Sequence, residues 1–133
     1  PPPLLLEEQL QRFDGYAAPR NTLLRERLEA TREKLLIEPD ESYTIELFIA
    51  ENSEPARTER FLLRARDLVP LPEVYVVPVA GATRRGSRYV LRMTYGMFAD
   101  KEAAAEAAKR LPPKYQNAFK FELRSLAELR RAI

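Results

Sequence analysis

Polar side chains alternate with apolar ones in two segments of the sequence, SYTIELFIA (residues 42–50) and RYVLRMTYG (residues 88–96). Such alternation is typical of a β-strand with one face in the core and one face in water. If the more apolar set faces the core, the other face carries Thr44, Glu46, Phe48, Val90, Arg92 and Thr94. Hydroxyl, carboxylate and guanidinium groups hydrogen-bond to sugars, and a phenyl ring stacks on a sugar or a base. The pattern therefore predicts a polar binding platform or, alternatively, a solvated face with one weak Glu46–Arg92 ion pair.

Charged residues also gather in two loops. Arg84, Arg85 and Arg88 surround a glycine, where they could hold a phosphate or a carboxylate, or only keep a turn solvated. Glu51 and Glu54 follow the first strand segment without an evident partner for acid–base work, so we interpret them as part of a solvated loop.

The composition excludes several classes of chemistry. The chain has neither Cys nor His, which rules out thiol nucleophiles, imidazole acid–base catalysis and a conventional zinc site. No glycine-rich phosphate loop, nucleophile elbow or metal-ligand spacing occurs. The 22 Lys and Arg against 20 Asp and Glu leave a net charge of +2, too little to indicate nucleic-acid binding. We therefore expect a non-enzymatic protein without a cofactor or metal.

Two helices are predicted before the first strand. Residues 4–13 form a short one that Asp14 and Gly15 end, and residues 21–36 form a longer one with Asn21 as its N-cap. Apolar positions recur at helical spacing on the longer helix, at Leu24, Leu28, Thr31 and Leu35. Three leading prolines predict the end of a linker from a longer protein, and no apolar run is long enough to cross a bilayer.

Strands and helices alternate after residue 41. A strand over 42–50 buries Tyr43, Ile45, Leu47 and Ile49, and a helix over 53–68 follows it. Pro78 donates no backbone hydrogen bond, which makes 74–79 an edge strand. A strand that ends at Gly96, a helix over 100–111 capped by Asp100, a strand over 119–123 and a short C-terminal helix complete the chain.

This order predicts an α+β fold of the βαββαβ type, with a four-stranded antiparallel sheet and two helices on one face. The first and third strands are central, and the other face stays open unless another segment covers it. We assign residues 1–40 to a linker end and a helical extension, and residues 41–133 to the βαββαβ domain.

Four motifs in this order resemble the SPOR domain, a peptidoglycan-binding family. They are the opening strand YTIEL, the turn YGMF, the alanine-rich helix ADKEAAAEAAKRLP and the closing FELRSLAELRRAI. The resemblance covers the chain from about Tyr43 to the C-terminus.

The resemblance implies that the domain binds glycan strands stripped of stem peptides, a form enriched at the bacterial division septum. It implies a periplasmic domain of a membrane-anchored envelope protein, with Glu46, Phe48, Arg92 and Thr94 as binding residues and Tyr75 added from the edge strand. The family's frequent glutamine is Glu46 here, and an ionised carboxylate cannot donate a hydrogen bond.

Two other functions stay open. A protein docking or assembly domain would use the helix over 21–36 to cover the sheet or to self-associate. Single-stranded RNA binding fits the topology, but the third strand offers Arg92 and Thr94 where a stacking ring is needed, so we expect no nucleic-acid partner.

Overall fold

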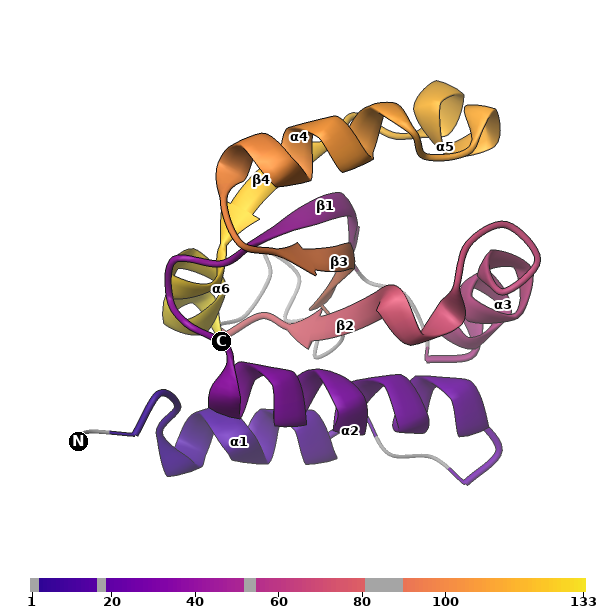
Figure 1. The fold of residues 1–133 in the computed structure, drawn as a ribbon. Helices are drawn as coiled ribbons and strands as arrows, with labels where there is room; N and C mark the ends of the chain where they lie inside the picture. Colours follow the sequence, from indigo (N-terminus) through magenta and orange to yellow (C-terminus); the bar gives the residue numbers. More distant parts are fainter. Residues whose placement is uncertain (1–2, 17–18, 52–54, 81–89) are drawn as a thin grey trace.

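The computed structural model describes residues 3–16, 19–51, 55–80 and 90–133 (Figure 1). Its antiparallel sheet has the strand order β2-β3-β1-β4. The strands are β1 (Tyr43–Glu51), β2 (Val74–Pro78), β3 (Val90–Phe98) and β4 (Glu122–Ser125). Helix α3 (Pro55–Ala65) and the 3₁₀ helix η1 (Leu71–Glu73) connect β1 to β2, and α4 (Lys101–Lys109) and α5 (Pro113–Ala118) connect β3 to β4. The predicted α+β fold, with the first and third strands central, is confirmed.

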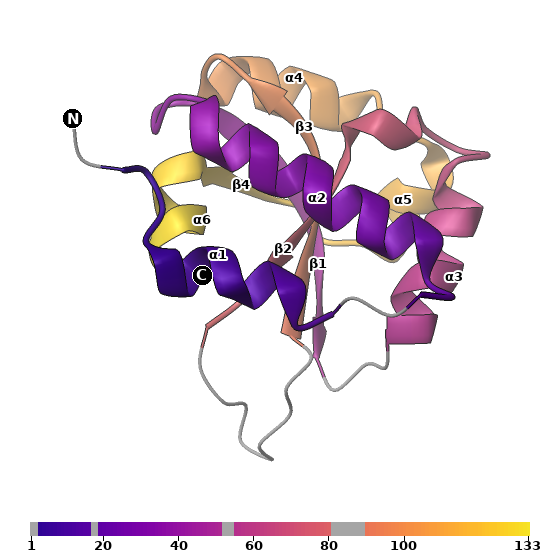
Figure 2. The same cartoon turned by 90° about the horizontal axis from the view of Figure 1, so that it is seen from below.

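Three further helices surround the sheet: α1 (Glu7–Asp14), α2 (Thr22–Ile37) and α6 (Leu126–Ala132). In Figure 1, α3 and α5 lie to the right of the strands and α6 lies to the left. Helix α6 therefore covers the sheet face that was predicted to be open. Figure 2 shows α1 on the same side as α6, with α2 between this pair and α3. Gln9 of α1 donates to the carbonyls of Arg130 and Ile133, which joins α1 to α6.

Helix α2 packs against the outer edge of β2. The Arg27 guanidinium donates to the Val74 carbonyl (2.8 Å), and the Thr31 hydroxyl accepts from the Val76 N–H (3.0 Å). An edge strand without such partners exposes unpaired backbone groups to other chains. Strand β2 is therefore at the edge of the sheet, as predicted, but side chains of α2 form hydrogen bonds with backbone groups on its outer side.

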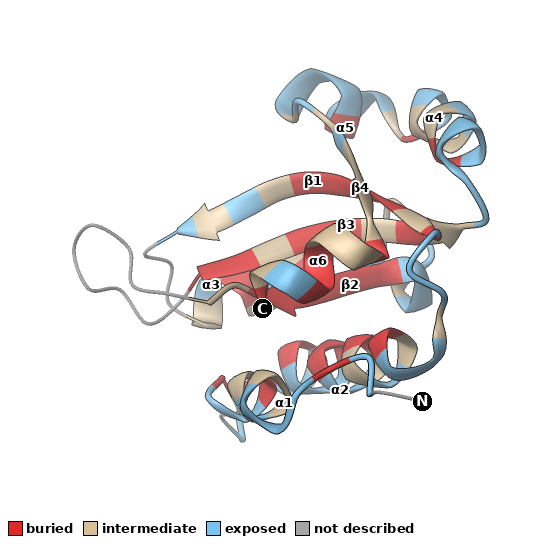
Figure 3. Cartoon of the chain, turned by 90° about the vertical axis from the view of Figure 1, so that its left-hand side faces the viewer, coloured by how far each residue is buried: buried red, intermediate tan, exposed pale blue. Residues whose placement is uncertain are grey.

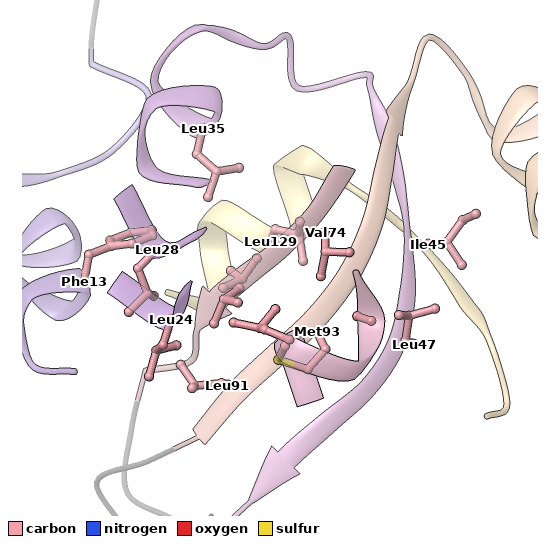
Figure 4. Close-up of a cluster of buried hydrophobic side chains, with 14 of the residues drawn as sticks. Phe13, Leu24, Leu28, Leu35, Ile45, Leu47, Val74, Leu91, Met93 and Leu129 are labelled. Carbon is pink, nitrogen blue, oxygen red and sulfur yellow. The ribbon is translucent and has the colours of Figure 1, made fainter. Parts of the chain in front are cut away.

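One hydrophobic cluster joins the N-terminal helices to the sheet (Figure 4). The predicted stripe of α2 is confirmed, since Leu24, Leu28, Thr31 and Leu35 are all buried. Figure 3 shows the buried residues concentrated on the strands and on the side of α2 that faces them. Residues 1–40 therefore share the core of residues 41–133.

One predicted cap and two predicted strand boundaries were wrong. Asn21 makes no capping hydrogen bond; instead Glu59 of α3 accepts from the N–H groups of Leu23 and Leu24. Strand β3 continues past Gly96, and β4 begins at Glu122 rather than Phe119. Asp100 caps α4 as predicted, by accepting from the Ala103 N–H.

Candidate functional site

The five predicted site residues do not form one open surface. Thr94 and Tyr75 are 0% and 2% exposed, and Glu46 is 4% exposed. Arg92 is half-buried, and Phe48 projects from the other face of the sheet. The prediction that this face is open was wrong, because helices and neighbouring side chains cover most of it.

Strand pairing explains the position of Phe48. Glu46 pairs with Thr94, but Phe48 pairs with Met93, so an extra residue in β1 shifts the register between them. Residues that lie opposite each other project from the same face, which places Phe48 with Met93 and away from Glu46. Ile49, predicted to face the core, pairs with Arg92 instead and is 40% exposed.

Four side chains from three adjacent strands form what we call the Glu46 cluster: Glu46, Arg92, Thr94 and Arg124. The Nε atoms of Arg92 and Arg124 each lie 3.4 Å from Oε1 of Glu46. The cross-strand pair between Glu46 and Arg92 is thus confirmed. Arg124 was missed because β4 was predicted to end at residue 123, one position too early to include it.

Helix α6 positions the outer part of this cluster. Ser125 caps the helix, and the Glu128 carboxylate accepts from the Ser125 N–H and lies 3.5 Å from Nη1 of Arg124. Burial alone would raise the pKa of Glu128, but the hydrogen bonds from Ser125 and Arg124 outweigh it and lower this pKa. Burial lowers the pKa of Arg124, and the charge of Glu46 outweighs it, so the net pKa is raised. Both groups are therefore charged at neutral pH.

The cluster also concentrates polar atoms without hydrogen bonds. Among the described residues, five buried side-chain atoms make no hydrogen bond, and four of them belong to the cluster: Oε1 of Glu46, Nε of Arg92, Oγ1 of Thr94 and Nε of Arg124. Three of these atoms, the Glu46 oxygen and the two arginine Nε atoms, are joined by the 3.4 Å ion pairs, and the Thr94 hydroxyl is the one atom of the four outside them. A buried polar group without a partner is a place where water or a ligand can bind. The side chains of Arg92 and Arg124 are 16% and 30% exposed, although their Nε atoms are buried.

Tyr75 pairs in register with Thr94 of the cluster but is itself buried. The guanidinium carbon of Arg27 lies 5.6 Å from the centre of its ring. Burial, followed by the charge of Glu73, raises the pKa of its hydroxyl. Tyr75 therefore joins β2 to α2 and is not an accessible stacking surface.

Most of the remaining predicted charged groups belong to segments that the structure does not describe. Arg84, Arg85, Arg88 and Glu54 lie outside the described residues. Within the described ranges, no group of three or more potential metal ligands occurs, and no helix is both long and apolar enough to cross a membrane.

The sequence and the fold were both compared with known proteins. Neither a scan against protein-family models nor searches of curated proteins and of solved structures found a match.

Proposed function

We propose that this chain is a non-catalytic glycan-binding module whose ligand is the peptidoglycan strand freed of its stem peptides. The proposal rests on the resemblance of its motifs to the SPOR family and places the module in the periplasm, as part of a larger envelope protein. The Glu46 cluster is the proposed contact site. The observation that carries this choice is the convergence of a buried carboxylate, two partly exposed arginine side chains and a buried hydroxyl without a hydrogen bond.

The chemistry of the cluster suits a sugar. A sugar hydroxyl both donates and accepts, so it can bridge a carboxylate oxygen and a guanidinium N–H. Glu46 lies between two arginines, which compensates its charge and leaves other guanidinium N–H groups available as donors. The exposed Ile49 beside Arg92 adds an apolar contact for a pyranose ring. Phe48 is not part of this site.

Cosedimentation with purified sacculi tests the proposal. We expect the chain to bind amidase-treated sacculi more strongly than untreated sacculi. Arg92→Gln and Arg124→Gln should each weaken binding about tenfold, as expected for one charged hydrogen bond. Arg66→Gln, at an exposed arginine after α3, is the matched control and should bind like the wild type.

Phe48→Leu distinguishes the Glu46 cluster from the site predicted from the sequence, which included Phe48. Its ring lies on the other face, so we expect glycan binding to persist in this variant. Circular dichroism must show that each variant is folded. Equal binding to treated and untreated sacculi, or full binding by both arginine variants, would rule out the Glu46 cluster as a glycan site.

A further inference from the structure

Two neighbouring cavities, of about 140 and 360 Å³, lie on the side of the sheet opposite to the Glu46 cluster and share Leu68. The smaller lies between α3 and α5, and the larger lies between the end of α3, β3 and the segment that joins α4 to α5. We call the two together the α3–α5 groove.

The smaller cavity is aromatic. Phe61 and Phe119 line it, and their rings pack with Phe48 at centroid distances of 5.0 Å. Its volume is close to that of a cavity that accommodates a benzene ring, about 150 Å³. It therefore has room for one aromatic or leucine side chain.

Tyr115 gives this cavity an unused polar group. The residue is 3% exposed, lines the cavity and makes no hydrogen bond through its hydroxyl to any described residue. Arg64, which lines the same cavity, is close enough to act electrostatically on the hydroxyl. A buried hydroxyl without a partner is costly, and a ligand that accepts its hydrogen bond would remove this cost.

The rim of the groove is positive. Arg64 and Lys114 line the smaller cavity and Arg110 the larger, all three exposed, while no Asp or Glu is among the described lining residues of either. An electropositive rim around apolar cavities favours an acidic partner, since opposite charges attract across an interface and like charges are rejected. The remaining lining consists of apolar side chains and Pro112 and Pro113.

We propose that the α3–α5 groove is a docking site for an acidic, extended segment of a partner protein. One apolar side chain of the segment fills the aromatic cavity, a second lies in the larger cavity, and carboxylates between them pair with Arg64, Lys114 and Arg110. A carboxylate that reaches inward also accepts from the Tyr115 hydroxyl. The groove and the Glu46 cluster lie on opposite faces, so both can be occupied at once.

Fluorescence anisotropy with two labelled peptides tests the groove. The acidic peptide carries a phenylalanine and a leucine among aspartates and glutamates; the neutral peptide has asparagines and glutamines at the acidic positions. We expect at least tenfold tighter binding of the acidic peptide, and an affinity that falls as salt concentration rises. Equal affinity for both peptides would overturn the proposal.

Charge reversals at exposed positions, and removal of the buried Tyr115 hydroxyl alone, locate the site. The double substitution Arg64→Glu with Lys114→Glu should abolish the preference for the acidic peptide, and Tyr115→Phe should weaken binding several-fold. Lys101→Glu, at an exposed lysine outside the groove, should bind like the wild type. Unchanged binding by the double variant would place the peptide elsewhere. The double variant should still cosediment with sacculi like the wild type. A loss of peptide binding can thus be distinguished from a loss of glycan binding.

Discussion

A buried carboxylate requires compensation from its neighbours, and Glu46 receives it from two arginines on the flanking strands. Removing one member of a buried ion pair leaves the other charges without compensation, which is usually strongly destabilising. Glu46→Ala should therefore lower the free energy of unfolding by about 2–4 kcal/mol, measured by urea denaturation. Glu46→Gln, which introduces the amide typical of the SPOR family, also removes the charge but keeps an acceptor between the arginines, so it should cost less than Glu46→Ala, about 1–2 kcal/mol.

The exposed Glu122 on the neighbouring strand is the matched control for this prediction. It pairs in register with Glu46, so its substitution perturbs the same part of the sheet. Glu122→Ala should change stability by less than about 0.5 kcal/mol. If Glu46→Ala were equally mild, the cluster would make no net contribution to stability.

Glu128 gives the cluster a dependence on pH. Its pKa is lowered in the folded state, so its contribution to stability is complete above the ordinary glutamate pKa of about 4.3 and disappears as the pH falls through the folded value. Thermal unfolding should show Glu128→Gln less stable than the wild type at neutral pH, with the difference vanishing in acid. Glu33→Gln, at an exposed carboxylate of α2, should show no such trend. A Glu128 difference that stays constant with pH would contradict this account.

At the residue scale, the sequence predicted the Glu46–Arg92 pair but not the position of Phe48. The pair depends only on two strands being neighbours and antiparallel. The side to which Phe48 points depends on a bulge, and one extra residue reverses every later side chain of a strand. Nothing in the alternation of SYTIELFIA marks where such a residue lies, since Phe48 and Ile49 are both apolar.

At the scale of the elements, Gly96 creates a second irregularity. Tyr43 pairs with Phe98 but Ile45 with Tyr95, so β3 contains an extra residue next to Gly96, whose φ is +71°. A Cβ atom there would lie 2.5 Å from the Phe98 ring. Gly96→Ala should therefore destabilise the protein by about 1–3 kcal/mol in urea denaturation, through backbone strain and displacement of the ring.

Gly15 is the matched control for this substitution. Its φ is −66°, and the nearest atom to an added Cβ is 3.6 Å away, so Gly15→Ala should be neutral or slightly stabilising. Adding Phe98→Leu to Gly96→Ala removes the steric part and leaves the backbone part. If Gly96→Ala alone were neutral, neither the strain nor the clash would matter.

Elements with strong periodicity were predictable, and those that depend on distant partners were not. The stripe of α2 follows helical spacing and is buried as predicted. The cap of α2 comes from Glu59, which lies in another helix, and no local pattern identifies such a partner. Helix α5 was missed because Pro112 and Pro113 were taken to end a helix, although Pro113 is also a favourable first residue of one.

At the scale of the whole molecule, the first 40 residues complete the fold that the next 93 begin. Arg130 of α6 donates to the carbonyls of Leu35 and Glu38 and lies 2.6 Å from the Asp40 carboxylate, which fastens the C-terminal helix to the end of α2. The stripe of α2 is buried within the chain, so it offers no apolar surface to a second copy. We therefore expect the full chain to be a monomer in multi-angle light scattering.

Deletion of residues 1–40 tests this role most directly. The deletion removes Leu24, Leu28 and Leu35, each worth about 1.5–3 kcal/mol of burial. Their sum approaches the total stability of a typical domain, about 5–15 kcal/mol. The deletion also frees the edge of β2, whose Val76 N–H loses Thr31 as its acceptor. We expect the shortened chain to bind a hydrophobic dye, lose its cooperative thermal transition and aggregate. A monomeric fragment that melts like the full chain would mean that residues 41–133 fold independently. Helices α1 and α2 would then not be required for the domain to fold.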